Sequence, residues 1–410
     1  MAEEGFSMNL RSDLASALAG ARMQTDQLFR LVRPEALYER PALERHRLIF
    51  YLGHLEAFDW NLICAGELEM PRFHPAFDRL FAFGIDPPPG QSPADRPSDW
   101  PSAEEVGAYG RQVRDRLDQV LPQAPEACIH AAIEHRLMHA ETFAYLLHNL
   151  PVEQKLPQAL EAGCERPAPQ SEMIEIPSGK AILGRQRGDG FGWDNEFVEH
   201  AIETPAFAIG KYKVTNSQYL QFVQQGGPAP HFWKRDGREW RYRTMFSEVP
   251  LPLSWPAYVS YDQAAQYAAW AGKSLPTEAQ FHRAAYGGEN ERTRPHPWGV
   301  APPDATRGNF DFAQWNPLPV DATPAGDSAL GVSQLVGNGW EWTSTVFHPF
   351  PGFEPLPFYP GYSADFFDGA HFVLKGGSAR TAAVLLRRSF RNWFRPGYPY
   401  AYAGFRCVEN

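Results

Sequence analysis

The sequence predicts an α+β protein in which a four-helix bundle precedes a domain of mixed helices and strands. Apolar residues recur at helical spacing through the first 150 residues, whereas the rest of the 410-residue chain is rich in Gly, Trp and Pro and has only short apolar runs. Between these parts, residues 151–171 have the Pro-, Gln-, Glu- and Ala-rich composition of a linker. We therefore expect domains at 1–150 and 172–410.

Four segments of the first domain are predicted to be helices. Periodic apolar residues and intervening Pro-rich connections place them near 9–32, 42–67, 102–121 and 125–150. Four helices of this length form a bundle most simply. The connection after the second helix is long and contains Pro87-Pro88-Pro89-Gly90. It either carries function or only links the second helix to the third.

The second domain is expected to contain short elements ordered by the packing of aromatic side chains. Alternating apolar runs predict strands at Ile174–Gly184, Phe207–Lys213 and Phe372–Gly377. Short helices are predicted at Ser217–Gln224 and Tyr261–Ala271. The sequence contains no internal repeat.

Composition narrows the classes of partner. A net charge of −10 without a long run of Lys and Arg argues against nucleic acid. No segment approaches the roughly 20 apolar residues that span a bilayer, and charges interrupt Met1–Leu18, so neither a membrane anchor nor a signal peptide is expected. The four cysteines are scattered without C-x-x-C spacing, which favours a reducing cytoplasm over a disulfide framework or a zinc knuckle: Cys64, Cys128, Cys164 and Cys407.

Histidines in two of the predicted helices suggest a metal site. His135 and His139 lie four residues apart and so face the same way, and His54 belongs to the amphipathic segment 45–66. Three imidazoles leave coordination positions open, as in catalytic rather than structural sites. Against this, such a pair also arises by chance, and a single His on an apolar face is more often a core residue. Glu141 is expected to orient a ligand or to make a packing contact.

The second domain contains a series of distinctive motifs, which in chain order are Asp194-Asn195-Glu196, Val214-Thr215-Asn216, Leu275-Pro276-Thr277-Glu278, Gly337-Asn338-Gly339-Trp340-Glu341-Trp342-Thr343, Gly376-Gly377-Ser378 and Gly404-Phe405-Arg406-Cys407. This series resembles the sulfatase-modifying-factor domain, also described as formylglycine-generating-enzyme-like, whose fold is C-type-lectin-like. The resemblance spans 172–410. Most of these motifs are expected to support the architecture, because Gly permits tight turns and polar side chains satisfy backbone groups.

Together with the histidine-bearing bundle, the whole chain resembles the family of non-heme iron synthases that make ergothioneine and selenoneine. In that family a DinB-like bundle supplies three histidines to Fe(II), which implies His54, His135 and His139 as ligands here. The resemblance also implies an enzyme that uses O2 as co-substrate. Its reaction bonds the imidazole carbon of hercynine (trimethylhistidine) to a chalcogen from a second small molecule, and no obligate protein partner is implied.

The same resemblance implies a substrate pocket in the second domain. Asn392 and Trp393 would contact hercynine, whose quaternary ammonium suits an aromatic face; the alternative is that Trp393 is a core residue. Either Tyr359 or Tyr362 would donate a proton or an electron during the oxidation, and the sequence leaves the choice open. The other residues implied for substrate binding are Met138, Phe394, Arg395 and Tyr398.

Departures from the family pattern bear on the chalcogen donor. Members that use γ-glutamylcysteine carry an acidic residue and an arginine where this chain has Phe394 and Tyr398, and a glutamine where it has Met138. They also have basic residues in the connection that here is 90–100. A charged donor would lose its partners in such a pocket. These substitutions favour a selenosugar, and hence selenoneine synthesis, over the alternative of ergothioneine synthesis from cysteine or γ-glutamylcysteine.

Three other classes of protein fit parts of the sequence. A copper-dependent formylglycine generator would need a cysteine pair near the final strands, but residues 377–391 contain no Cys and Cys407 stands alone. A DinB-like zinc thiol transferase would share the three histidines without needing the second domain. A non-enzymatic, lectin-like binding module would not depend on His135.

Overall fold

The computed structural model describes residues 2–82, 93–159, 166–288 and 294–409, with side chains from residue 12 onward. It divides into two compact units, Met1–Gln158 and Ala159–Asn410. We call them the helical unit and the mixed unit. The α+β fold class, with a helical bundle followed by a mixed domain, is confirmed. None of the helices in these ranges is long and apolar enough to cross a bilayer.

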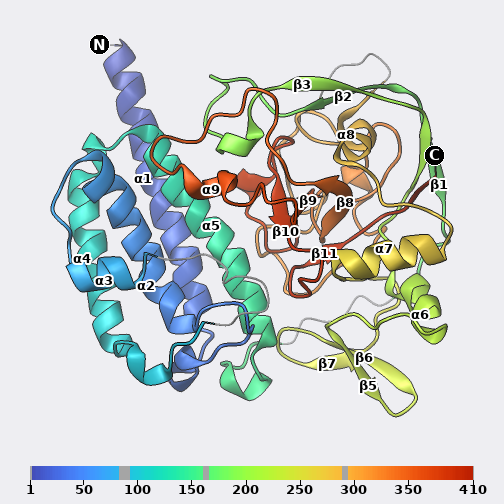
Figure 1. The fold of residues 1–410 in the computed structure, drawn as a ribbon, viewed down its shortest axis with the longest axis horizontal. Coiled ribbons are helices and arrows are strands. Elements are labelled where there is room, and N and C mark those ends of the chain that lie inside the picture. Colours follow the sequence, from blue (N-terminus) through green and yellow to red (C-terminus); the bar gives the residue numbers. More distant parts are fainter. Residues whose placement is uncertain (1, 83–92, 160–165, 289–293, 410) are drawn as a thin grey trace. The chain divides into compact units, whose positions relative to one another are not determined.

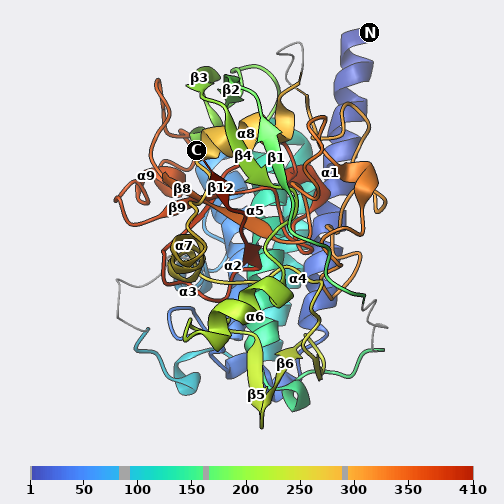
Figure 2. The same cartoon turned by 90° about the vertical axis from the view of Figure 1, so that its right-hand side faces the viewer.

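The helical unit is built from four long helices that run along one another (Figures 1 and 2). Helix α1 packs along α5, and α2 packs against both α4 and α5. Helix α2 continues directly into a π-helical segment, Trp60–Glu67, an irregularity often found at functional sites. The long helices are α1 (Ala2–Phe29), α2 (Leu48–Asp59), α4 (Ala103–Val120) and α5 (Glu126–Asn149).

All four predicted helices are present, with some differences at their ends. The second begins at Leu48 rather than residue 42, and the short helix α3 (Pro75–Leu80) follows it. Single 3-10 turns occupy Pro34–Tyr38, Pro97–Asp99, Leu121–Gln123 and Val152–Gln154. The Pro87–Gly90 part of the predicted connection, Cys164 and part of the predicted linker lie outside the described residues.

Helix α4 illustrates why these segments fold as they do. Its buried residues recur at helical spacing and form one apolar stripe: Val106, Tyr109, Gly110, Val113 and Leu117. At its start, the Ser102 hydroxyl accepts a hydrogen bond from the Glu105 N–H at 3.2 Å, and the Glu105 carboxylate accepts one from the Ser102 N–H at 2.9 Å. This capping box satisfies backbone groups that a helix end would otherwise leave unpaired.

In its described residues, the mixed unit contains four small sheets and four short helices. A four-stranded sheet has the order β10-β9-β8-β11, in which only β8 and β11 are parallel; a second has the order β1-β4-β12, seen side by side in Figure 2. The strands of these sheets are β1 (Met173–Ile176), β4 (Phe207–Gly210), β8 (Trp340–Val346), β9 (Phe372–Lys375), β10 (Asn392–Phe394), β11 (Ala403–Gly404) and β12 (Val408–Glu409).

The mixed unit also contains two smaller groups of paired strands and several helices. A hairpin and a three-stranded meander consist of β2 (Gly179–Leu183), β3 (His200–Thr204), β5 (Trp233–Asp236), β6 (Glu239–Arg243) and β7 (Glu248–Pro250). The helices are α6 (Asn216–Gln224), α7 (Tyr261–Trp270), α8 (Glu278–Tyr286) and α9 (Gly361–Ala364), with 3-10 turns at Asp194–Glu196, Pro324–Gly326 and Ala383–Leu385.

The predicted short elements of the mixed unit are confirmed in place but not in length. The predicted strand at 174–184 is two strands, β1 and β2, and the strands predicted at 207–213 and 372–377 end at Gly210 and Lys375. Both predicted short helices are present as α6 and α7. Pro177 and Ser178 lie between β1 and β2, and Gly376, with a positive φ of 97°, directly follows the last residue of β9.

Two kinds of interaction hold the mixed unit together. An apolar core joins β1 and β4 to α8, with Ile176, Phe207, Ile209 and Phe281 among its buried members. A buried ion cluster lies beside β8, where Glu341 accepts two hydrogen bonds from the Arg406 guanidinium at 2.8 and 3.0 Å and pairs with Lys213 at 3.1 Å. All three charged side chains are fully enclosed.

Asn338, in the turn before β8, has a purely architectural set of contacts. Its backbone is left-handed, with φ of 59°. Its side-chain amide accepts a hydrogen bond from the Leu318 N–H at 2.7 Å and donates to the Leu318 carbonyl at 2.8 Å and to Gln334 Oε1 at 2.9 Å. The amide therefore fixes residues twenty positions away along the chain.

Two substitutions of Asn338 separate the contribution of its side-chain hydrogen bonds from that of its left-handed backbone. We expect Asn338→Ala to lower the free energy of unfolding by about 3 kcal/mol, because the Leu318 backbone groups lose their partners inside the protein. Asn338→Gly loses the same hydrogen bonds but tolerates the left-handed backbone, so it should be more stable than the alanine variant by about 1 kcal/mol. Urea unfolding followed by tryptophan fluorescence measures both; two variants of wild-type stability would contradict this account.

Candidate functional site

Three histidines of the helical unit come together as the sequence predicts. His54 of α2 and His135 and His139 of α5 each offer a ring nitrogen, and these atoms all lie within 4.8 Å of one another. It is the one cluster of three or more potential metal ligands found in the described ranges. Glu141 is buried but does not belong to it.

The three imidazoles are electrically neutral at physiological pH. Burial lowers the pKa of His54 to about 4, and burial together with the proximity of the other histidines and of Arg136 lowers the pKa values of His135 and His139 well below the usual range. Neutral imidazole is the form that binds a metal ion. The cluster is therefore ready to accept a cation without first losing protons.

His54 is held in one orientation by a backbone group. Its Nδ1 lies 2.7 Å from the Phe81 carbonyl oxygen, which can only accept, so Nδ1 carries the proton. The other nitrogen, Nε2, is buried and has no hydrogen-bond partner among the residues that the structure describes. A buried nitrogen lone pair without a partner fits a missing metal ligand bond, and the carbonyl is the kind of outer contact that usually orients a ligating histidine.

Aromatic side chains of α2 pack against each histidine. Phe50 stacks on His54 with ring centroids 4.8 Å apart, and Phe58 stacks on His135 at 3.4 Å. Tyr51 lies at 5.8 Å from His139. These rings restrict the imidazole orientations and exclude water from one side of the cluster.

The Phe81 carbonyl is itself fixed by a second layer of contacts that the sequence does not reveal. The Phe81 ring is fully buried and fills the space left by the missing side chain of Gly53. Just before it, the buried Asp78 carboxylate accepts hydrogen bonds from the Tyr109 hydroxyl at 2.8 Å and from the His74 N–H at 3.1 Å. The one signal in the sequence is the glycine directly before His54.

Arg136, which directly follows His135, is a second buried feature that the sequence analysis does not identify. The Arg136 guanidinium pairs with Glu56 at 3.0 Å and with Asp59 at 2.7 Å, both on α2. Burial alone would raise the pKa of the Glu56 carboxyl, but Arg136 and Arg114 outweigh burial and lower it to about 2. A charged residue within a mostly buried helix is the sequence signal that could have indicated this network.

In the mixed unit the structure brings several of the implied pocket residues together. Trp393, on β10, lies parallel to Phe347 at 4.2 Å and meets the edge of Tyr362 at 5.5 Å. Tyr359 lies 5.7 Å from Tyr362. Trp393 and Tyr359 are half-buried, whereas Tyr362 is buried and stacks on Trp193 at 3.9 Å.

The two candidate tyrosines differ in their surroundings. Burial, with further effects of Asp365 and Asp194, raises the pKa of Tyr359 to about 12, so its hydroxyl keeps its proton. Tyr362 lies in α9 next to Ser363: the Asn195 amide donates to the Ser363 hydroxyl at 2.9 Å, and that hydroxyl donates to Asp194. Asp194 and Asn195 thus support the segment that carries Tyr362.

The residues after Trp393 include a stacked aromatic pair. Phe394 and Tyr398 stack in parallel with their centroids 4.8 Å apart, and Tyr398 is buried. Asn392 and Arg395 on either side are half-buried, and Asn392 Oδ1 accepts a hydrogen bond from the Trp393 N–H at 2.9 Å. In the helical unit, Met138 is half-buried on α5 between the two histidines in sequence.

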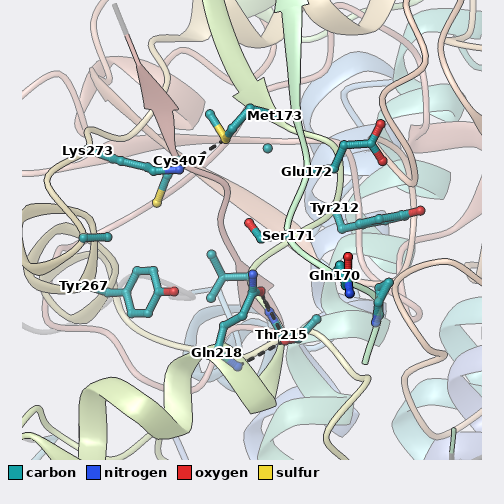
Figure 3. Close-up of a pocket in the computed structure, with 14 residues that line it drawn as sticks. Gln170, Ser171, Glu172, Met173, Tyr212, Thr215, Gln218, Tyr267, Lys273 and Cys407 are labelled. Atoms are coloured by element: carbon teal, nitrogen blue, oxygen red, sulfur yellow. Dashed lines mark hydrogen bonds between the residues drawn. The ribbon is translucent and has the colours of Figure 1, made fainter. Parts of the chain in front are cut away.

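A separate cavity of about 100 Å³ opens in the mixed unit near the start of β1 and the end of α7 (Figure 3). Tyr267, Lys273 and Cys407 are among its lining residues. Burial raises the pKa of the Cys407 thiol to about 12, although Lys273 opposes this, so the thiol is not a reactive thiolate. None of the residues implied for the metal or the substrates lines this cavity.

Each of the two units matches the model of a known protein family. The model of the sulfatase-modifying factor enzyme 1-like domain matches residues 159–410, and that of the DinB superfamily matches residues 17–149. Hercynine oxygenase of Mycolicibacterium thermoresistibile is 32% identical over 434 aligned residues, which cover 98% of this chain and 96% of that protein.

Two further relatives extend the comparison. Hercynine oxygenase of Mycolicibacterium smegmatis is 33% identical over 336 residues, covering 74% of this chain and 77% of that protein. Ergothioneine biosynthesis protein 1 of Neurospora crassa is 28% identical over 486 residues, covering 92% of this chain. The chain spans 55% of the length of that fungal protein.

The packing around His54 can be tested through Gly53. A Cβ at this position would lie 2.6 Å from three ring carbons of the fully buried Phe81, so we expect Gly53→Ala to lower the free energy of unfolding by about 2 kcal/mol. Gly20→Ala is the matched control, because a Cβ there meets nothing within 4 Å and alanine favours the helix by about 1 kcal/mol. Chemical denaturation monitored by circular dichroism compares them; equal effects of the two substitutions would refute the close packing of Phe81 on Gly53.

Proposed function

The chain belongs to the hercynine oxygenase family, and from this membership we propose that it is an O2-dependent enzyme that oxidises hercynine and forms a carbon–sulfur bond at its imidazole, as in ergothioneine biosynthesis. The observation that carries the proposal is the cluster of three neutral histidines in a chain that aligns with a hercynine oxygenase over nearly its whole length. Both parts are needed, because a DinB-like bundle alone also fits a thiol transferase.

We assign Fe(II) to His54, His135 and His139. Three neutral nitrogen ligands leave positions open for small molecules, which suits a catalytic metal rather than a structural one. When bound, iron would supply the electron transfer that O2 activation requires. The protein would contribute the fixed imidazole orientations, through the Phe81 carbonyl and the stacked rings of Phe50 and Phe58.

In the mixed unit, the aromatic group around Trp393 is proposed to receive the trimethylammonium of hercynine. Such a cation cannot donate a hydrogen bond and is stabilised by aromatic faces. The half-buried positions of Asn392 and Trp393 are consistent with contact to a ligand. Tyr359 and Tyr362 are the two candidates for a proton or electron donor, and the raised pKa of Tyr359 supports a role that requires an intact hydroxyl.

A second candidate function differs only in the chalcogen donor. The stacked pair of Phe394 and Tyr398 offers no charge to γ-glutamylcysteine. Within the described part of the connection at 93–100, Asp95 accepts hydrogen bonds from Arg47 at 2.8 Å and from the Trp100 indole at 2.8 Å, so Arg47 is already paired. These observations favour a neutral donor such as a selenosugar, and with it selenoneine synthesis.

The metal assignment predicts the behaviour of histidine variants. We expect the anaerobically reconstituted protein to hold one equivalent of Fe(II), and His54→Ala, His135→Ala and His139→Ala to lose most of it, because each removes one of only three protein ligands. His130→Ala, on the same helix but outside the cluster, should retain iron. Elemental analysis measures the metal. Full zinc occupancy with O2-independent thiol transfer would instead support the transferase class.

The donor is tested by supplying hercynine, O2 and Fe(II)-loaded protein with cysteine, γ-glutamylcysteine or a selenosugar in parallel. The proposed function predicts a sulfoxide adduct of hercynine from a thiol donor, read by mass spectrometry. A selenium adduct from the sugar alone would establish the second candidate, and no O2-dependent adduct from any donor would refute both. We expect Phe394→Asp with Tyr398→Arg to shift the preference toward γ-glutamylcysteine, since charged partners return to the pocket.

A further inference from the structure

We propose that Arg136 is a positioning residue that sets the register of α2 against α5 and thereby brings His54 opposite His135 and His139. This inference deepens the proposed function and rests on the metal site assigned there. It concerns the ion network behind the histidines rather than the histidines themselves.

The Arg136 guanidinium is attached to one full turn of α2. It pairs with Glu56 at 3.0 Å and with Asp59 at 2.7 Å, and it donates a hydrogen bond to the Leu55 carbonyl at 3.1 Å. Arg136 directly follows His135 on α5, and Glu56 lies two residues after His54 on α2. The network therefore joins the two helices at the same level as their candidate metal ligands.

This branched set of contacts, which we call the Arg136 fork, can form in only one register of α2 against α5. Two apolar helix faces can pack in several registers, and a shift by one turn displaces a side chain by about 5.4 Å. That displacement exceeds the 4.8 Å within which all three ligand atoms lie. A planar guanidinium that must meet two carboxylates and a carbonyl keeps its hydrogen bonds in only one arrangement.

His135 and His139 depend on this register more than His54 does. His54 is oriented by its hydrogen bond to the Phe81 carbonyl, whereas Nδ1 of His135 and Nδ1 of His139 are buried and have no hydrogen-bond partner in the described part of the chain. The rings of Phe58 and Tyr51 that pack on these two histidines also belong to α2. A change of register would therefore remove both the opposing ligand and the packing.

The energetics favour a role in geometry over a role in stability. Taking charges fully out of water costs free energy that an ion pair recovers only if every polar atom finds a partner. Three atoms of this network are buried without a partner in the described ranges: Glu56 Oε2, Asp59 Oδ1 and Arg136 Nε. A well-packed apolar cluster in this place would stabilise the bundle at least as well, but it would not specify the register.

The test replaces the network by apolar side chains and measures geometry separately from stability. In Arg136→Met with Glu56→Leu and Asp59→Leu, no charge of the fork remains, and Arg114 keeps its bidentate contact with Asp26. We expect this triple variant to unfold at a temperature no lower than the wild type, yet to bind Fe(II) at least about tenfold more weakly and to give an altered visible spectrum with Co(II).

Two controls separate positioning from general damage. Arg406→Met with Glu341→Leu and Lys213→Met removes the corresponding buried ion cluster of the mixed unit, and it should leave Co(II) affinity and spectrum unchanged. Arg136→Lys keeps the charge but loses the fork, so it should weaken metal binding even if the triple variant fails to fold. Far-UV circular dichroism verifies helical structure in every case.

The outcomes are distinguishable. If the wild type binds neither Fe(II) nor Co(II), the metal assignment and the proposed function fail. If the wild type binds and either the folded triple variant or Arg136→Lys matches its affinity and spectrum, only the positioning role is overturned. A mixed-unit control that changes the spectrum as much as Arg136→Lys would overturn it as well.

Discussion

The structure of the helical unit depends on a guanidinium that is buried rather than solvated. Arg136 is fully enclosed, and its contacts extend through Glu56 to Arg114 on α4 and from there to Asp26 on α1. One connected set of charges therefore links all four long helices. The mixed unit also contains a buried ion cluster, in which Arg406 and Lys213 pair with Glu341. In each unit, a buried ion cluster fixes which elements are neighbours, and apolar packing supplies the stability.

Burial acts in opposite directions on the groups around the histidine cluster. It holds the pKa of His54 near 4, and the positive charge of Arg136 lowers the pKa of all three imidazoles further. For Glu56 the same arginine overcomes burial and keeps the carboxylate ionised. The arrangement thus places neutral nitrogen donors beside the ionised pair of Glu56 and Arg136. A cation entering the cluster meets lone pairs, and the negative charge of Glu56 is already matched by arginine.

The sequence predicts those parts of the structure that depend on periodicity. The four long helices and the facing pair of His135 and His139 follow from spacing within one element, and the resemblance to a known family supplies His54 as the third member. The hydrogen bond from His54 to the Phe81 carbonyl joins residues 27 positions apart, and the Arg136 fork joins residues about 80 apart. No local pattern encodes such contacts. The split of the 174–184 strand into β1 and β2 has the same origin, because β1 pairs with β4 whereas β2 pairs with β3.

The chemistry on hercynine and the choice of donor are separable in physical terms. Under the proposed function, the first depends on the histidine cluster and on the aromatic group around Trp393, and the chain belongs to the family of the hercynine oxygenases. The second depends on charge complementarity, and here Phe394, Tyr398 and the paired Asp95 depart from what an anionic thiol would need. An oxidising centre does not select between nucleophiles of similar reactivity unless the pocket holds one of them more firmly. Membership of the family therefore determines the reaction more strongly than it determines the chalcogen, and in our proposal the few side chains after Trp393 select the donor.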